Sequence, residues 1–257
     1  LYEKFESFRK LLHIIGMNQL TAAELQRYSR HLVLQDFGMA NQLKLRNARV
    51  LVVGAGGLGW PVLLYLAAAG VGEIGVIDSD KLELSNLQRQ VLYTMADIGR
   101  SKSQAAVDRL AQLNPDIRLT AFSLRLSSNN ALDIMKNFDV IIDGTDNFPT
   151  RYLINDACVI LNKPFIYASI LEFEGQAAVF NHQYKNGEYS ANYRDVFPEP
   201  PSPESVPNCE QAGVLGVLPG MIGCIQASEA IKVLTGIGEP LADKLLILDV
   251  ATMQQSI

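Results

Sequence analysis

Four groups of polar residues in this sequence could act together on a charged ligand. They are Asp78, the pair Asn86 and Arg89, Lys102, and Asp146, and each follows a predicted strand or opens a predicted helix. Ligands of open α/β sheets bind at the carboxyl ends of the strands, so these side chains are expected to meet at one site. Two cations could neutralise the β- and γ-phosphates of a nucleoside triphosphate, and a hard carboxylate could hold Mg²⁺. The pattern therefore predicts a nucleotide site with Arg89 and Lys102 on the phosphates and Asp146 on magnesium.

A glycine-rich turn precedes these residues. It follows the apolar run 49–53 and leads into a helical pattern over about 60–69, and its glycines are Gly54, Gly56, Gly57 and Gly59. Glycine lets the backbone turn tightly and approach a ligand, and the following helix presents free N–H groups to an anion. Alone the motif is weak and fits a dinucleotide equally well. Asp78, at the end of the next apolar run, lies at the spacing expected for binding a ribose, which strengthens the nucleotide interpretation.

Each of these residues also has a simpler explanation when taken alone. An aspartate after a strand, such as Asp146, is more often a helix cap or turn former than a metal ligand. Lys102 fits a solvated helix residue, and Arg89 fits a surface ion pair. The order of all the groups along one chain favours the site. A nicotinamide site would use the glycine turn and Asp78 but has no need of the additional cations and second acid.

The elements that would position these residues alternate between strand and helix. Strands are expected at 49–53, 73–78, 117–123, 138–143, 165–169, 176–180 and, last, 244–249. Helices are expected at 21–34, about 60–69, 101–113, 130–136, 149–161 and 216–234, and residues 182–211, with five prolines, are expected to form a long mobile or extended loop. This order predicts an α/β fold with a Rossmann-like, mostly parallel sheet and helices on both faces, continuing into a mixed or antiparallel C-terminal part.

Composition narrows the class of protein. The 257 residues, 48% of them hydrophobic, suit one large domain, and a net charge of −5 without long blocks of either sign argues against nucleic acid as a partner. The three cysteines form no C-x-x-C pair, so a reducing, cytoplasmic setting is expected. The apolar run 213–225 is short and contains Pro219, so no membrane span is expected. Residues 1–16 lack the pattern of a signal peptide and are interpreted as an amphipathic extension of uncertain origin before Met17.

Six motifs in this order identify a resemblance. They closely resemble those of the MoeB/ThiF/HesA family, bacterial relatives of ubiquitin-activating enzymes, from about Thr21 to the end of the chain. Of its branches, the chain is more similar to the molybdopterin-synthase adenylyltransferases than to the thiamine-pathway enzymes. The motifs are Arg27-Tyr28-Ser29-Arg30, Gly54-x-Gly56-Gly57-Leu58-Gly59, Asp78-x-Asp80, Ser85-Asn86-Leu87-Gln88-Arg89-Gln90, Gly99-x-x-Lys102 and Thr145-Asp146-Asn147.

The resemblance implies an adenylyltransferase that uses ATP and Mg²⁺. Its substrate would be the C-terminal glycine of a small ubiquitin-like sulfur carrier ending in Gly-Gly, for molybdenum cofactor synthesis or a related sulfur transfer involving a sulfur donor. The resemblance also implies a single domain over 17–257, with a nucleotide-binding half to about 163 and a carrier-binding half from 164. Roles carried over are the nucleotide contacts of Gly54, Gly56, Gly57, Ser85 and Asn147, the ribose contact of Asp78, the phosphate contacts of Asn86, Arg89 and Lys102, and magnesium at Asp146.

Two further residues carry expectations from the resemblance. Arg30, outside the nucleotide unit, matches an arginine that reaches the nucleotide of the partner subunit, which implies a homodimer. A surface arginine on an amphipathic helix is the simpler alternative. Cys209 lies where some relatives have a thiol that receives the carrier or its sulfur, although Glu210 would raise its pKa slightly. Cys158 and Cys224 lie in apolar helical patterns and fit core positions.

The chain departs from the family pattern at the zinc site. Relatives hold a structural zinc with two C-x-x-C pairs, and the first pair is replaced here by Asn192-Tyr193-Arg194-Asp195. These groups are poor structural zinc ligands, so no zinc is expected. Other functions stay open: a nicotinamide-dependent oxidoreductase, a relative that adenylates a peptide or a tRNA, and a non-catalytic scaffold that binds a ubiquitin-like partner.

Overall fold

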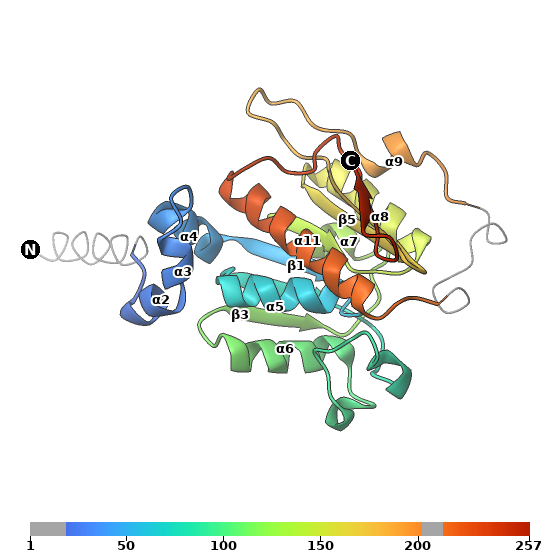
Figure 1. The fold of residues 1–257 in the computed structure, drawn as a ribbon, viewed down its shortest axis with the longest axis horizontal. Coiled ribbons are helices and arrows are strands. Elements are labelled where there is room, and N and C mark those ends of the chain that lie inside the picture. Colours follow the sequence, from blue (N-terminus) through green and yellow to red (C-terminus); the bar gives the residue numbers. More distant parts are fainter. Residues whose placement is uncertain (1–18, 202–212) are drawn as a thin grey trace, which may run out of the picture.

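The computed structural model describes residues 19–201 and 213–257. Its centre is one eight-stranded sheet in the order β3-β2-β1-β4-β5-β6-β7-β8, in which β1 to β5 run parallel and β6 to β8 pair antiparallel (Figure 1). The strands are β1 Arg49–Val53, β2 Glu73–Ile77, β3 Arg118–Phe122, β4 Val140–Asp143, β5 Phe165–Leu171, β6 Glu174–Phe180, β7 Leu246–Asp249 and β8 Gln254–Ser256. The predicted fold class is confirmed.

Helices cover both faces of the sheet, because alternate residues of the central strands are apolar on each side. Val50 and Val52 of β1 belong to a core with α5, α6 and α11, whereas Leu51 and Val53 belong to a second core with α7, α8 and α9. The first set of helices is α5 Gly59–Ala69, α6 Lys102–Leu113 and α11 Val217–Thr235. The second set is α7 Ala131–Met135, α8 Phe148–Leu161 and α9 Tyr193–Val196.

The order in which strands are added to the sheet changes from one side of β1 to the other. Open α/β sheets have a binding crevice at such a switch point. From β1 the chain continues to β2 on one side, and β4 lies on its other side. Val53 is level with Ile77 of β2 and with Asp143 of β4. The segments that follow these strands therefore leave the sheet at one edge, the place where open α/β sheets bind ligands.

Three short helices lie at the opposite end of the sheet, where β1 begins (Figure 1). They are α2 Ala22–Arg27, α3 Ser29–Leu32 and α4 Gly38–Asn47. The predicted capping box of Thr21 and Glu24 is present, but the prediction of one helix over 21–34 was wrong. The break is at Tyr28, whose φ and ψ are −95° and 11°. Its hydroxyl accepts a hydrogen bond from Asn114 Nδ2 (2.9 Å), which holds the residue against the sheet layer.

Two further expectations need correction. The segment expected as a loop from residue 182 contains α9 and an antiparallel bridge between Gln183 and Tyr189 within its described part. The strand expected to be last is followed by β8, which pairs with it although all three of its residues are exposed. Residues 1–18 and 202–212, and with them Cys209 and the N-terminal extension, lie outside the described residues.

Helix α11 has the length and mean hydropathy of a membrane span, with 19 residues at 1.3. It packs against α5, β5 and β6 and contributes Ala227 and Ala230 to the core. Of its apolar stretch, 44% is buried inside the protein, so part of its apolar surface lies against the core.

Candidate active site

A cleft of about 1220 Å³ lies at the carboxyl ends of β1, β2 and β4 and extends along β5 to α9. Most of the predicted ligand-binding residues line it, namely Gly54, Gly56, Gly57, Asp78, Asn86, Arg89, Lys102, Asp146 and Asn147. Ser85 is exposed and is not among the lining residues, and neither is Arg30, which is exposed on α3. The structure therefore brings nine of the predicted residues together and leaves Arg30 remote from its own cleft.

The glycine turn is held by close backbone contacts. Gly54 has a φ of +96°, and a Cβ added at Gly59 would lie 1.9 Å from the Gly54 oxygen. Gly144, which follows β4, joins this contact, because a Cβ on it would lie 2.6 Å from the same oxygen. Sequence reasoning did not assign a role to Gly144, although its place after a strand gave a signal. The contact requires glycine at all three positions and fixes the turn against the end of β4.

Asp78 connects the glycine turn to the end of β2. Its Oδ2 accepts a hydrogen bond from the Ala55 backbone N–H (2.9 Å), and its Oδ1 accepts one from the Asp80 N–H (2.8 Å). Burial raises the pKa of the Asp78 carboxyl, whereas the two backbone hydrogen bonds and the charge of Lys102 act in the opposite direction. The carboxylate is thus oriented at the cleft wall, at the position expected to hold a ribose.

Lys102 begins α6 and has a largely buried side chain. Its Nζ lies 3.0 Å from Oδ2 of Asp80, which is itself exposed. Behind it, the Tyr93 hydroxyl lies within hydrogen-bond distance of two backbone carbonyl oxygens, 2.8 Å from that of Ala55 and 3.3 Å from that of Lys102. The glycine turn and the start of α6 are therefore joined through one buried tyrosine.

The segment from Ser85 to Gln90 forms a compact turn that includes the 3₁₀ helix η1, Leu84–Asn86. Asn86 is buried and its Oδ1 accepts a hydrogen bond from the Glu83 N–H. The Arg89 carbonyl accepts one from Nε1 of Trp60 on α5 (2.8 Å). Among the described residues no carboxylate pairs with the Arg89 guanidinium, whose Nη1 donates only to the Ser85 carbonyl (3.2 Å). Arg89 is therefore a cation with capacity for an anionic ligand.

The turn after β4 presents Asp146. Asp143 Oδ1 accepts hydrogen bonds from the N–H and the hydroxyl of Thr145, at 2.8 and 2.6 Å. Arg151 of α8 pairs with the other Asp143 oxygen, so the turn is fixed from two sides. Asn147 Oδ1 accepts from the Thr150 N–H and caps α8, a structural role that the sequence prediction did not include.

Asp146 suits a magnesium ligand by its chemistry. It is exposed at the cleft, and its carboxylate has no hydrogen bond or ion pair with another described residue. Mg²⁺ keeps several waters and is commonly held by one or two carboxylates together with substrate phosphates. No group of three or more His, Cys, Asp or Glu side chains converges in the described part of the chain, at this site or at another. One carboxylate beside a phosphate site therefore fits this ion.

The segment at the expected zinc position is held by protein contacts. Asn192 and Asp195 form a capping box around α9, and the Arg194 guanidinium makes a two-pronged contact with Asp156 at 2.7 and 2.8 Å. Tyr193 is 1% exposed and packs within an aromatic cluster with Tyr152 and other rings. These side chains are already committed to one another and do not form a thiolate-like metal site.

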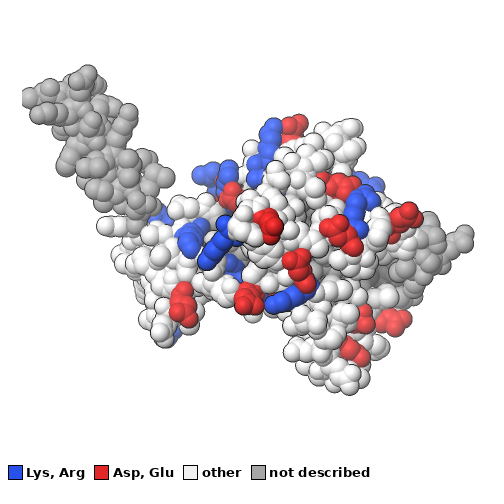
Figure 2. Space-filling view, turned by 90° about the horizontal axis from the view of Figure 1, so that it is seen from above, with Lys and Arg blue, Asp and Glu red and all other residues white. Residues whose placement is uncertain are grey.

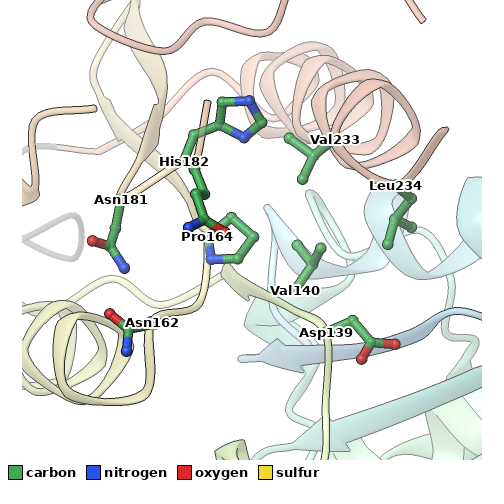
Figure 3. Close-up of a pocket in the computed structure, with 9 residues that line it drawn as sticks. Asp139, Val140, Asn162, Pro164, Asn181, His182, Val233 and Leu234 are labelled. Atoms are coloured by element: carbon green, nitrogen blue, oxygen red, sulfur yellow. The ribbon is translucent and has the colours of Figure 1, made fainter. Parts of the chain in front are cut away.

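A second, smaller cavity of about 280 Å³ lies at the amino end of β4, away from the glycine turn. Figure 3 shows His182, Asn162 and Asp139 around it. Partial burial lowers the pKa of the His182 imidazole, and the Asp243 charge opposes that change. None of the predicted site residues lines this cavity.

The face of the molecule drawn in Figure 2 carries acidic and basic side chains interspersed with one another. Its described residues form no basic stripe of the kind that binds nucleic acid.

Comparisons with known proteins agree with this architecture. The ThiF family profile matches residues 28–257. A sulfur carrier protein adenylyltransferase of Thermus thermophilus is 53% identical over 229 residues, which are 89% of this chain and 84% of that protein. The probable adenylyltransferase/sulfurtransferase MoeZ of Mycobacterium tuberculosis is 53% identical over 234 residues, which are 91% of this chain and 59% of that protein. The chain thus spans less than two thirds of MoeZ.

A solved structure shares the fold. The crystal structure of Escherichia coli MccB with ATP superposes with a TM-score of 0.76 at 25% identity, over 90% of this chain and 70% of MccB. The resemblance stated from the motifs is confirmed by the profile match and by the T. thermophilus relative. The chain belongs to the ThiF family.

Proposed function

We propose that this chain is an ATP- and magnesium-dependent adenylyltransferase that activates the C-terminal glycine carboxylate of a ubiquitin-like sulfur carrier. The observation that carries the proposal is the arrangement of one cleft. Asp78, Arg89, Lys102 and Asp146 line its end nearest β1, and the same cleft continues along β5 to α9. A nucleotide and an extended peptide tail could therefore lie end to end. The names of the T. thermophilus and M. tuberculosis relatives support this chemistry.

The proposed reaction is the one that the family resemblance implies, and these side chains have the charges that it needs. A carrier carboxylate oxygen attacks the α-phosphorus of ATP, the bond from that phosphorus to the bridging oxygen breaks, and pyrophosphate leaves with the electron pair. Arg89 and Lys102 stabilise the negative charge that develops on the phosphate oxygens, and Asp78 holds the ribose. Magnesium held by Asp146 would supply further charge neutralisation when bound. Catalysis of this kind depends mainly on position and electrostatics.

A homodimer would complete the site. Arg30 is exposed on α3, and α4 lies between α3 and the start of β1 at the end of the sheet away from the cleft. An arginine in this place can serve a nucleotide only if that nucleotide is bound by another copy. The exposed apolar side chains nearby, Val33 (77%) and Leu34 (54%), fit an interface between copies. The dimer, the cytoplasmic setting and the absence of zinc are parts of this proposal.

One experiment tests the function directly. The protein is incubated with ATP, magnesium, labelled pyrophosphate and sulfur carriers ending in Gly-Gly, and carrier-dependent exchange of pyrophosphate into ATP is measured. Exchange that requires both the carrier and its terminal glycine is expected. Tight ATP binding without exchange would favour a peptide or tRNA substrate or a scaffold, and binding of NADH in place of ATP would favour the oxidoreductase.

A further inference from the structure

Gln90 is a buried residue of the cleft to which the proposed reaction assigns no role. It is 3% exposed, lines the cleft and follows Arg89. Its backbone is fixed, because its N–H donates to the Asn86 carbonyl (2.9 Å) and its own carbonyl accepts from the Tyr93 N–H (3.2 Å). The direction in which its side chain leaves the backbone is therefore set by the turn.

The Gln90 carboxamide has no partner in the described protein. Its Oε1 is buried without any hydrogen bond, and its Nε2 donates to no other described residue. A buried amide oxygen without a hydrogen bond costs free energy, and such atoms are rare in native structures. Gln226 shares the unpaired Oε1, but its Nε2 donates to the Asp143 carbonyl (2.7 Å), so its amide is partly satisfied. Gln90 thus stands apart as an amide with an unused donor in a binding cleft.

The unused donor lies beside the glycine turn. A Cβ placed on Gly56 would be in ordinary van der Waals contact with Gln90 Nε2 at 3.6 Å, so this nitrogen lies next to the backbone of the glycine turn. Gly56 follows Ala55, whose N–H donates to the proposed ribose ligand Asp78. The amide therefore lies close to where the ribose meets the phosphates, and Arg89 adjoins it in sequence.

Resting on the proposed function, we infer that Gln90 Nε2 donates a hydrogen bond to an α-phosphate oxygen of the bound nucleotide. The neutral Gln90 amide would orient the phosphate through a directional hydrogen bond, without adding to the positive charge of Arg89 and Lys102. The bond would fix the α-phosphate for attack by the carrier carboxylate, while Arg89 and Lys102 neutralise charge farther along the phosphate chain. Gln90 would then be a binding residue for the reacting group.

The test compares Gln90→Met with Gln104→Met, because Met keeps the length of glutamine and removes its amide. Gln104 is exposed on α6 and does not line the cleft. Binding of adenosine, AMP and ATP is measured by calorimetry for each protein. Loss of a hydrogen bond to a charged group should make the dissociation constants of Gln90→Met for AMP and ATP roughly 10- to 100-fold larger. Adenosine binding by Gln90→Met should stay within about twofold of the wild type, and Gln104→Met should bind all three ligands like the wild type.

Other outcomes overturn the inference. Unchanged AMP affinity excludes the α-phosphate contact, and an equal loss for adenosine and AMP means that Gln90 shapes the cleft and does not contact phosphate. The melting temperature of Gln90→Met without nucleotide should be no lower than that of the wild type, because the substitution removes a buried amide oxygen that has no hydrogen bond. If Gln90→Met does not fold, Gln90→Glu replaces it, and repulsion should weaken AMP binding at least as much. Failure of the carrier-dependent exchange assay in the wild type overturns the function alone, since nucleotide binding is measured separately.

Discussion

Arg151 Nε donates to Asp143 Oδ2 across 2.8 Å, and both side chains are almost fully buried. The guanidinium also donates to the Ala168 carbonyl (3.2 Å) and lies over the Tyr167 ring. Burial lowers the pKa of Arg151, but the Asp143 carboxylate outweighs it and keeps the pKa above its usual range. This pair therefore connects the turn that carries Asp146 to β5 and α8.

Removing Arg151 should destabilise the protein strongly. Arg151→Met leaves the Asp143 carboxylate buried without its cation, and the expected loss in the free energy of unfolding is about 3–5 kcal/mol. Urea denaturation measures it. The control is Lys136→Met, which breaks the exposed pair with Asp133 and should leave the free energy of unfolding almost unchanged. Equal effects of the two substitutions would contradict the role given to the buried pair.

Removing either of the cations that we propose to bind phosphate should reduce catalysis with little effect on folding. Arg89→Ala and Lys102→Ala should each lower kcat/KM for carrier-dependent pyrophosphate exchange by about 10²-fold or more, because each removes charge stabilisation in the transition state. Arg118→Ala, which removes an exposed cation paired with Glu73, is the matched control and should keep full activity. Activity within threefold of the wild type for Lys102→Ala would exclude its catalytic role.

Ribose binding should depend on pH through Asp78. Because burial raises the pKa of this carboxyl, it gains a proton at a higher pH than an ordinary aspartate as the solution is acidified. The protonated acid is a weaker acceptor for ribose hydroxyls, so adenosine affinity should be constant at neutral pH and decline as the pH falls through the raised pKa. Calorimetry over this range measures the decline. Asp78→Asn should bind weakly at every pH without an acid limb, and an identical limb in that variant would assign the titration elsewhere.

Mixed dimers test the proposed contribution of Arg30. An Arg30→Ala chain and an Asp146→Ala chain should each be nearly inactive alone. After mixing and subunit exchange, one of the two sites in a mixed dimer would contain both an intact Asp146 and the Arg30 of the other copy. Partial recovery of pyrophosphate exchange is expected, up to about a quarter of the wild-type rate for random pairing. No recovery despite demonstrated exchange would argue against a contribution in trans.

The fold is expected to be independent of zinc. Elemental analysis of the purified protein should find less than a stoichiometric amount of zinc, and a zinc chelator should leave the melting temperature unchanged, because Arg194, Asp156 and Tyr193 hold α9. Arg194→Ala is the complementary change and should lower the melting temperature modestly, since both partners of this ion pair are partly exposed. One tightly bound zinc per chain would contradict the prediction.

The sequence was sufficient for elements with a clear apolar period. Strand β1 and helix α5 were predicted within a residue because continuous apolar runs and glycines mark them. Helix α4 was missed because polar contacts hold it in place. Gln42 donates to the Ala69 carbonyl (2.8 Å) and Lys44 to the Thr235 carbonyl. Hydrophobic periodicity carries no signal for such contacts.

The sequence indicated which residues belong to the site, but it did not indicate the hydrogen bonds among them. The positions of Asp78, Lys102 and Asp146 after strands and at a helix start placed them at one edge of the sheet. Asn147 was expected at the nucleotide; it lines the cleft, and its Oδ1 also caps α8, a contact that the sequence did not indicate. No role of its own was assigned to Gln90 from the sequence, because its unpaired amide oxygen becomes visible only when the surrounding backbone is in place.

Because of the contact among Gly54, Gly59 and Gly144, the two ends of the cleft should differ in how well they tolerate substitution. At these three positions an added methyl group meets backbone atoms, which cannot rotate aside as a side chain can. Combinatorial libraries that vary these three glycines should yield mainly proteins that do not fold. On the wall formed by α9, Val196 is 45% exposed and lines the cleft, so its side chain can be exchanged without meeting the backbone. Substitutions intended to change the substrate should therefore be made at the α9 wall, and the residues of the glycine turn should be kept unchanged.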